Sequence, residues 1–438
     1  MLQMRDIFFD EFYEELEQTV SNLRSEDIRI TPPDRVIEAL RQRWHEHGSA
    51  KRSSSLTLVA IDGGVQRAQY SHGWTVSIGR ACAFIYSPEE KNNGHRIRKS
   101  VKIHIGRVFD DRDKGYIPSY VRLIAEYNAA RAAAEEVLGS GSLPLVLLDG
   151  SLYLSRFPYA EREYLSHPEI LAELFESMNA LHSLGRDRGF PVVALSKDTS
   201  VFYLYMVLLR EIVARSGIDG RLTDIIAEST SPLSLREKMG RLKEEERKLL
   251  DDLLGGVKPL SDPELVEAST RDSGFSHPLL LAPSIYYRRG DTLPSLYRRI
   301  RGLLPKERAE RVVSALEGFF SRPPVAITYW KPRRDGRPFR VDVSGSSLGK
   351  TSSMRNVKPN IFVAEDCDLS VLREVLDNLA FCFCNDVEYN IPLHQADLLA
   401  RFDRQLYTSC YEPFLVNRME ERGIVLRSRI RDLREAIR

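Results

Sequence analysis

The chain has 438 residues, enough for about two or three domains or for one domain with large insertions. Its formal net charge is +1 at pH 7, which excludes a uniformly basic nucleic-acid binder and leaves only local basic patches to attract phosphate. No apolar stretch is long enough to span a bilayer, the acidic N-terminus is unlike a signal peptide, and the five cysteines form no zinc-type pairs, so we expect a cytoplasmic protein with no membrane segment and reduced thiols.

Helices and then strands are predicted in the first part of the chain. Residues 4–24 form an amphipathic pattern typical of a helix, and a second helix is expected to end near His47, before a polar hinge at 51–55. Three strands follow, at 56–62, 74–86 and 101–108. The last two show the apolar alternation of half-buried strands.

Helices alternate with strands in the next part. Pro118 opens a long alanine-rich helix that ends near Gly139. A strand at 145–149, a helix at 168–188 and a strand at 191–197 come next. A meander of antiparallel strands followed by such units is the layout of the ribonuclease-H-like fold. We therefore expect an α/β fold with a ribonuclease-H-like core, a mixed central sheet and flanking helices.

Further elements are expected to surround this core. A helix is predicted at 201–216, and a charged helix at 236–254 is expected to project within a helical insertion at about 216–275. The later elements are strands at 325–331 and 339–343 and helices at 370–385, 392–409 and 413–438. The polar hinge predicts a division between an N-terminal helical segment, 1–50, and one large domain, 51–438.

Three acidic residues stand at corresponding points of the predicted core. Asp62 and Asp149 each follow a buried apolar run and precede glycine, and Glu126 lies on the helix between them. Taken singly, Asp62 and Asp149 fit a turn, since Asp-Gly is a common turn dipeptide, and a helical glutamate usually faces solvent. Together they match the strand, helix and strand positions at which a ribonuclease-H-like core carries its acids.

A cluster of carboxylates favours a bound cation, because the charges repel one another and raise their own pKa values unless a cation neutralises them. Oxygen ligands with no thiolate nearby suit Mg²⁺ or Mn²⁺. Two such ions, roughly 3.5–4 Å apart, activate water and stabilise the leaving oxygen in phosphodiester cleavage. Lys197, after the strand at 191–197, is placed to orient the water or offset phosphate charge; the alternative is a surface lysine.

A second candidate segment lies late in the chain. Pro392 suits the first turn of a helix, and His394 and Asp397 are three residues apart, so they share a face of that helix. Asp397 is a candidate fourth metal ligand and His394 a candidate proton carrier. The alternative for Asp397 is an acidic residue that favours the helix N-terminus.

The serine-rich loop at 344–353 resembles a phosphate-binding loop but departs from its pattern. Gly345 lies one position too close to Gly349, and the segment after Lys350 is a poor helix. We interpret it as a basic loop that touches a DNA backbone.

Arginines accompany tyrosine or other aromatic residues in three clusters at 286–289, 297–301 and 331–334. Arginine forks bind phosphate and tyrosines stack on unpaired bases, so the clusters predict a nucleic-acid channel; solvated surface is the alternative.

The chain resembles the NurA nucleases, which are archaeal and some bacterial proteins of DNA end resection. The resemblance depends on VAIDGG, RLIAEYNAARAAAE, LVLLDGSL, VVALSKD, AITYWK, FRVDV and NIPLHQAD, in that order, and extends from about Leu56 to Arg404. It implies a ring-shaped homodimer with Mn²⁺-dependent nuclease activity on DNA. It also implies 5′-to-3′ degradation of single- and double-stranded DNA, nicking of single strands, and work with the hexameric helicase HerA beside the nuclease–ATPase complex that senses double-strand breaks.

The resemblance also assigns site residues. Asp62, Glu126 and Asp149 match the metal-binding acids of the family, and Lys197 matches its lysine. Many members have histidine where this chain has Asp397, so either His394 or Asp397 is the functional late residue. The chain also departs from the family at Gly64, where many members have serine. The N-terminal segment resembles the part used for dimer contacts and helicase docking.

Two other functions compete with the nuclease. One is a non-catalytic DNA-binding or adaptor protein on the same fold. The other is nucleotide hydrolysis at the serine-rich loop, for which Lys350 would be needed.

Overall fold

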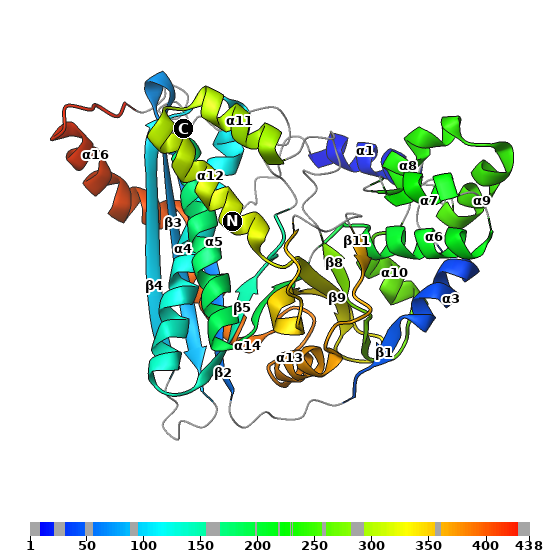
Figure 1. Ribbon diagram of the computed structural model, residues 1–438. Coiled ribbons are helices and arrows are strands. Elements are labelled where there is room, and N and C mark those ends of the chain that lie inside the picture. The colour runs from blue at the N-terminus through cyan, green and yellow to red at the C-terminus, as the bar shows by residue number, and fades with distance from the viewer. Residues whose placement is uncertain are drawn as a thin grey trace. The chain divides into compact units, whose positions relative to one another are not determined.

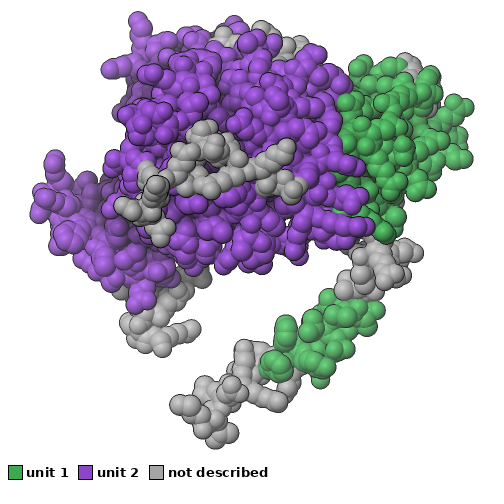
Figure 2. All heavy atoms as spheres, turned by 90° about the horizontal axis from the view of Figure 1, so that it is seen from below, with its two compact units in different colours: residues 1–44, 199–271 green, residues 45–198, 272–438 purple. Residues whose placement is uncertain are grey.

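The structure is a computed structural model that forms two compact units. It describes residues 9–21, 31–48, 56–87, 95–154, 167–197, 199–217, 220–227, 229, 231–255, 260–281, 293–354 and 361–427. The smaller unit combines residues 1–44 with 199–271, and the larger unit combines 45–198 with 272–438 (Figure 2).

A mixed sheet forms the centre of the larger unit (Figure 1). From edge to edge its strands are β1 (Trp44–Glu46), β7 (Gly274–Ser276), β9 (Val325–Lys331), β10 (Phe339–Ser344), β6 (Val192–Ser196), β5 (Leu143–Asp149), β2 (Leu56–Gln69), β3 (Trp74–Tyr86) and β4 (His95–Arg107). Two short strands, β8 (Leu279–Leu281) and β11 (Ile361–Val363), pair beside β9.

The strand directions confirm the predicted mixed α/β fold. β2, β5 and β6 are parallel neighbours, whereas β2, β3 and β4 form an antiparallel meander. On the other side, β10 is antiparallel to both β6 and β9. A meander that leads into parallel strands is the layout on which the ribonuclease-H-like interpretation depends, and that narrower assignment stays an interpretation.

Helices cover both faces of this sheet. On one face α4 (Asp111–Gly139) packs on β2 and β3 and runs beside α5 (Pro168–Arg188), on which α12 (Lys306–Ser321) lies (Figure 1). α11 (Leu293–Leu303) packs against α12. On the other face α14 (Ile391–Ala400) packs on β2 and β3, and α13 (Leu369–Phe381) contributes to a core shared with Leu58, Leu147 and Val193.

Two neighbouring glycines of β2 establish that α4 and α14 cover opposite faces. A Cβ atom at Gly63 would lie 2.6 Å from the Glu126 Oε1 atom of α4. A Cβ atom at Gly64 would lie 2.7 Å from the carbonyl oxygen of Ala400, at the end of α14. Successive residues of a strand point to opposite faces. Helices therefore approach the β2 backbone closely from both sides at this point.

Several predicted boundaries are wrong, because local capping and strand pairing override the sequence pattern. α4 begins at Asp111 instead of Pro118. The Asp110 side chain accepts a hydrogen bond from the Arg112 backbone, and the acidic residues Asp111 and Asp113 stabilise the first helical turn. β2 does not end at Asp62 but continues to Gln69, because β3 pairs with it through both glycines. β4 likewise begins at His95, ahead of the predicted strand at 101–108.

Two predicted helices are interrupted. The helix expected at 236–254 is α8 (Pro232–Lys238), a 3₁₀ turn and then α9 (Glu244–Leu254), since the Glu246 side chain accepts a hydrogen bond from the Lys243 backbone and starts a new helix. The helix expected at 392–409 stops at Ala400. The Asp403 side chain then caps α15 (Arg404–Leu406), which leads through a π-helical turn into α16 (Glu412–Glu420).

The smaller unit is helical. It contains α1 (Phe9–Ser21), α3 (Asp34–Gln42), α6 (Tyr203–Arg215), α7 (Gly220–Ala227), α8, α9 and α10 (Asp262–Ser269). The buried Asp262 carboxylate accepts hydrogen bonds from the backbones of Leu204 and Tyr205, at 2.9 Å each, and so joins α10 to the start of α6. The predicted division into residues 1–50 and 51–438, with an insertion at about 216–275, stays a prediction.

Crossing a bilayer takes more length and apolar character than any helix in the described ranges has.

Candidate metal centre

Asp62 and Asp149 lie on neighbouring strands at the point where β5 ends. The parallel pairing of β2 with β5 ends at Ile61 and Leu148, and the two aspartates are the next residues of each strand. Paired residues of neighbouring strands point to the same face, and side chains alternate along each strand. Both aspartates therefore project to the face covered by α14, and their charges interact.

Asp62 has the environment of a carboxyl group that resists ionisation. Its side chain is buried, with 8% relative exposure. Burial, together with the charges of Asp149 and Asp397, raises the pKa of Asp62 to about 7, although a hydrogen bond of 2.7 Å from the Gly63 backbone opposes the shift. Without a cation, this site is only partly ionised at neutral pH.

Glu126 reaches the same region from α4, across Gly63 and therefore from the opposite face of the sheet. Burial, together with the charges of Asp62 and Asp149, raises the pKa of Glu126 to about 8, although the Arg122 charge opposes the shift. Its Oε1 atom lies 3.2 Å from Arg122 Nη1 but has no hydrogen-bond partner in the described part of the chain. A buried carboxylate oxygen without a donor is costly unless a cation or water satisfies it.

Lys197 contacts the acidic cluster directly. Its Nζ atom lies 3.3 Å from Asp149 Oδ2 and 3.3 Å from the hydroxyl oxygen of Tyr389, and 4.8 Å from the centre of the tyrosine ring. The lysine therefore places a positive charge beside Asp149, at the position that the sequence predicted.

Tyr389 is a site residue that the sequence interpretation missed. Burial raises the pKa of its hydroxyl, and a hydrogen bond to Asp149 and the charges of Asp149, Asp62 and Asp397 raise it further, so the group stays protonated. The one available signal was its position directly before Asn390, whose side chain caps α14 by accepting a hydrogen bond of 3.1 Å from the Leu393 backbone.

Asp397 and His394 differ in their surroundings. The Asp397 charge raises the pKa values of Asp62 and Tyr389, although the same carboxylate also pairs with Arg401 at 3.0 Å. His394 Nε2 lies 3.8 Å from Glu388 Oε1. The Asp397 charge thus acts on Asp62, whereas His394 lies near Glu388.

A thiol also lies next to the aspartates. Cys82 of β3 pairs directly with Asp62 of β2. Burial raises the pKa of the Cys82 thiol to about 11, so it is protonated at neutral pH. The sequence did not indicate that a cysteine lies beside Asp62.

A buried ion pair fixes the loop that follows Asp149. Asp342 is fully buried and accepts hydrogen bonds from Arg340 at 2.7 and 2.8 Å, from the Ser151 hydroxyl at 2.7 Å and from the Leu152 backbone at 3.0 Å. Arg340 also donates to the Ser151 hydroxyl at 3.0 Å. The network holds residues 151–152 and hence the end of β5 that carries Asp149.

The donors of this cluster fit a hard divalent cation, but as placed they do not form a complete site. Within the described ranges, no three His, Cys, Asp or Glu side chains are grouped so that they could hold a metal ion. The oxygen-only donor set and the raised pKa values of Asp62 and Glu126 nevertheless favour Mg²⁺ or Mn²⁺, which would replace the protons. The residues that would hold such an ion are Asp62, Asp149 and Asp397, with Glu126 adding negative charge from the other face of the sheet.

The predicted basic clusters have largely structural contacts. Lys331 is buried, Arg333 pairs with Asp386 at 2.6 Å, and Arg301 pairs with Glu310 at 2.8 Å. The cluster at 286–289 lies outside the described residues. A channel built from these arginines stays a prediction.

The serine-rich loop does not have the form of a phosphate-binding loop. After β10, residues Gly345–Leu348 form one 3₁₀ turn, and the described residues 349–354 open no α-helix. A phosphate-binding loop needs a helix N-terminus at this point, so the nucleotide-hydrolase alternative loses its structural basis.

Comparison with known proteins identifies the family. The family model of the NurA domain matches residues 56–352. The chain belongs to the NurA family. A search of curated proteins finds no match.

Solved NurA structures are also similar to this NurA chain. The NurA nuclease from Sulfolobus solfataricus is 16% identical, with 95% of this chain and 98% of that chain covered and a TM-score of 0.48. Another NurA crystal structure and a structure of NurA bound to dAMP and manganese are each 13% identical over 93% of this chain and 96% of theirs, with TM-scores of 0.41 and 0.40. The family assignment depends on the sequence match.

Gly64 shows how this NurA chain departs from the family pattern stated above. A side chain at this position would meet the carbonyl oxygen of Ala400 at 2.7 Å. Serine would not fit unless the segment at the end of α14 moved. Glycine at position 64 therefore allows that segment to approach β2 closely.

Proposed function

We propose that this NurA protein is a metal-dependent deoxyribonuclease that hydrolyses phosphodiester bonds. The observation that carries the proposal is the position of Asp62 and Asp149 on neighbouring strands directly after the last β2–β5 residue pair, with Lys197 and Tyr389 beside Asp149 and the Asp397 charge acting on Asp62. Family membership makes a nuclease the first function to test at such a site. The chemistry that bound Mn²⁺ or Mg²⁺ supplies is polarisation of the phosphate and a lowered pKa of water.

The protein's own residues have separable roles in this proposal. Asp62, Asp149 and Asp397 hold the cation on one face of the sheet, and Glu126 adds negative charge from α4. Lys197 offsets negative charge on the phosphate, since its ammonium group lies beside Asp149. Tyr389, protonated and hydrogen-bonded to Asp149, holds that carboxylate in place.

The finer activity that we propose is degradation of single- and double-stranded DNA from 5′ ends, with endonucleolytic cutting of single strands, in DNA end resection and double-strand-break repair. The partners are a second copy of the chain, a HerA-type hexameric helicase and the nuclease–ATPase complex that senses breaks. In support of a protein partner, α1 leaves Phe9, Phe12, Tyr13, Leu16 and Val20 exposed. Five free cysteines agree with a reducing cytoplasm.

The decisive experiment compares Asp62→Asn and Asp149→Asn with wild type on labelled DNA in Mn²⁺ and in EDTA. Each variant should fold and should lose cleavage by at least about 100-fold, the scale on which electrostatic groups of an active site act. Asp111→Asn is the matched control, because Asp111 is exposed and pairs with Lys114 in the first turn of α4. Undiminished cleavage by both site variants would refute the assignment.

The adaptor alternative predicts another pattern. Wild-type protein would bind DNA equally in Mn²⁺ and in EDTA, and would not degrade it in either. That result would replace the nuclease with a DNA-binding function on the same fold.

A further inference from the structure

Arg322 is a buried cation that forms no ion pair with an acidic side chain among the residues that the structure describes. Its side chain is 8% exposed, and its pKa, which burial lowers to about 10, leaves it charged at neutral pH. Its Nε atom donates to the Phe319 carbonyl at 3.3 Å, and its guanidinium carbon lies 4.4 Å from the centre of the Phe319 ring. Its Nη1 atom is buried and has no hydrogen-bond partner in the described part of the chain. A buried charge in this state is costly unless something pairs with it.

Polar groups surround this guanidinium. A cavity of about 10 Å³ is lined by Arg322 with the polar residues His182, Ser183, Arg186, Ser344 and Ser346. The Nε2 atom of His182 is also buried without a hydrogen-bond partner among the described residues, and burial with the Arg322 charge keeps this histidine neutral by lowering its pKa. The Ser344 and Ser346 hydroxyls lie 2.8 Å apart. These side chains, with Pro323, Val325 and Met354, enclose a space the size of one oxygen atom.

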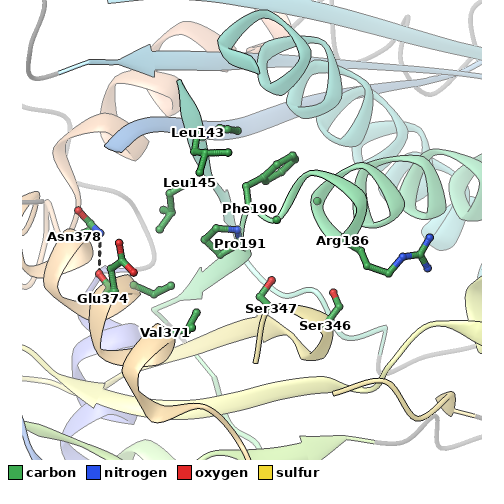
Figure 3. A pocket seen from close by; sticks show the side chains of 14 residues that line it. Leu143, Leu145, Arg186, Phe190, Pro191, Ser346, Ser347, Val371, Glu374 and Asn378 are labelled. Carbon is green, nitrogen blue, oxygen red and sulfur yellow. Dashed lines mark hydrogen bonds between the residues drawn. The ribbon is translucent and has the colours of Figure 1, made fainter. Parts of the chain in front are cut away.

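A larger cavity lies beside this space and shares two of its lining residues. It has a volume of about 300 Å³ and is lined by Arg186 and Ser346 together with side chains of β5, α5 and α13 (Figure 3). Leu145, Phe190 and Val371 contribute apolar walls. Glu374 and Asn378 lie on the side away from Arg186 and Ser346 (Figure 3). A cavity of this size is at the small end of the range for organic ligands.

The chemistry of the two ends differs. The Arg322 end offers hydrogen-bond donors and positive charge, which suit an oxyanion. The other end carries the Glu374 carboxylate, which repels a second anion and accepts hydrogen bonds from hydroxyl groups. Asn378, 6% exposed, uses its Nδ2 atom to donate to the Glu374 carbonyl at 2.7 Å.

We propose that the two cavities together bind a small phosphate monoester, with one phosphate oxygen at Arg322, the phosphate between Arg186 and Ser346, and a hydroxylated organic part toward Glu374. The site lies on the α5 and α13 side of the larger unit, at the start of β5 and β6, whereas the acidic cluster lies where β5 ends. The proposal is independent of nuclease activity.

The test measures binding by calorimetry to the full chain in EDTA, so that the acidic cluster holds no metal. The probes are ribose 5-phosphate, inorganic phosphate and ribose. Ribose 5-phosphate should bind most tightly, inorganic phosphate more weakly, and ribose not at all. Equal affinity for the two phosphates, or no binding of either, would overturn the proposal.

Arg322→Met isolates the buried charge. It should weaken ribose 5-phosphate binding about tenfold or more, the effect of losing a hydrogen bond to a charged group. Without ligand, its melting temperature should equal or exceed that of wild type, because an unpaired buried charge is removed. Arg311→Met is the control: Arg311 lies on α12, is exposed and pairs with Glu176 at 2.7 Å, and its variant should bind normally.

Two further measurements keep the proposal testable if Arg322→Met does not fold. Ser346→Ala removes one hydroxyl and should weaken binding several-fold, whereas unchanged affinity would count against the site. A crystal soaked in ribose 5-phosphate should show phosphorus density beside Arg322; density only at Asp62 and Asp149 would overturn the proposal. General stabilisation by phosphate salts would raise the melting temperatures of wild type and Arg322→Met equally, and that outcome too would refute it.

Discussion

Asp62 and Asp149 directly follow the last residue pair of the parallel pairing between β2 and β5, so that two carboxylates stand side by side where one strand ends and the other continues. Because β5 ends here, no residue pair between β2 and β5 follows the two aspartates. The repulsion between the two carboxylates and the burial of Asp62 disfavour ionisation, so a bound cation would stabilise the charged form.

The first prediction concerns stability against pH. The folded state of Asp62 has a pKa of about 7, above the ordinary value of 3.8, so the folded protein binds more protons than the unfolded chain between these values. The free energy of unfolding should therefore fall as pH rises from about 4 to 7 in EDTA. Asp62→Asn should reduce this dependence, leaving the part that the raised pKa of Glu126 contributes, and should stabilise the protein by about 1–3 kcal/mol at pH 8.

Urea denaturation at pH 5 and pH 8 measures this effect. Added Mn²⁺ should restore stability to wild type at pH 8 and leave Asp62→Asn unaffected. A wild-type stability that rises with pH over this range, in parallel with the variant, would contradict the assigned protonation.

The second prediction concerns Gly63. A Cβ atom at this position would lie 2.6 Å from Glu126 Oε1, so Gly63→Ala must displace that carboxylate or the α4 backbone. The variant should lose about 1–3 kcal/mol of stability, as overpacked cores do, and should bind Mn²⁺ more weakly. Gly115→Ala is the matched control on α4, since a Cβ atom there meets nothing within 4 Å, and it should stabilise the protein slightly.

The third prediction distinguishes the contribution of Lys197 to cleavage from that of Tyr389. Tyr389→Phe removes the hydroxyl that contacts both Lys197 and Asp149 but keeps the ring under the lysine. We expect cleavage to fall about tenfold or more while DNA binding persists. Lys197→Gln should reduce cleavage further, and Lys197→Arg should recover part of it. Equal activity of Tyr389→Phe and wild type over the pH range would show that the hydroxyl has only a packing role.

The fourth prediction concerns the buried pair of Arg340 and Asp342. Asp342→Asn leaves Arg340 without its carboxylate and weakens the bonds to Ser151 and Leu152, so stability should fall by about 3–5 kcal/mol. In the folded fraction, Mn²⁺ affinity should fall as well, because the loop after Asp149 is released. Ser151→Ala tests this second effect with less damage, and a normal Mn²⁺ affinity in that variant would limit the pair to a structural role.

Much of the core was predictable because its strands are continuous apolar runs and because their order along the chain is regular. Asp62 and Asp149 were located from the ends of those runs, and Lys197 from the end of the next. Burial and neighbouring charge then explain why these groups interact.

Other features depended on contacts between distant segments. Pro118 is a common first residue of a helix, yet Asp110 caps α4 earlier. Tyr389 is marked locally only by its position before the cap residue Asn390, since its role arises only when the segment before α14 packs near Lys197. The approach of Glu126 from the other face of the sheet likewise requires knowledge of strand register, which no single segment of sequence contains.

At the neighbouring glycines Gly63 and Gly64 of β2, no side chain separates the strand backbone from the groups on either face of the sheet. The charge of Asp62 on one side raises the pKa of Glu126 on the other, and this effect needs no movement of the chain. The two sides of the sheet therefore titrate as one coupled system, whose apparent pKa values belong to the group of acids rather than to any member.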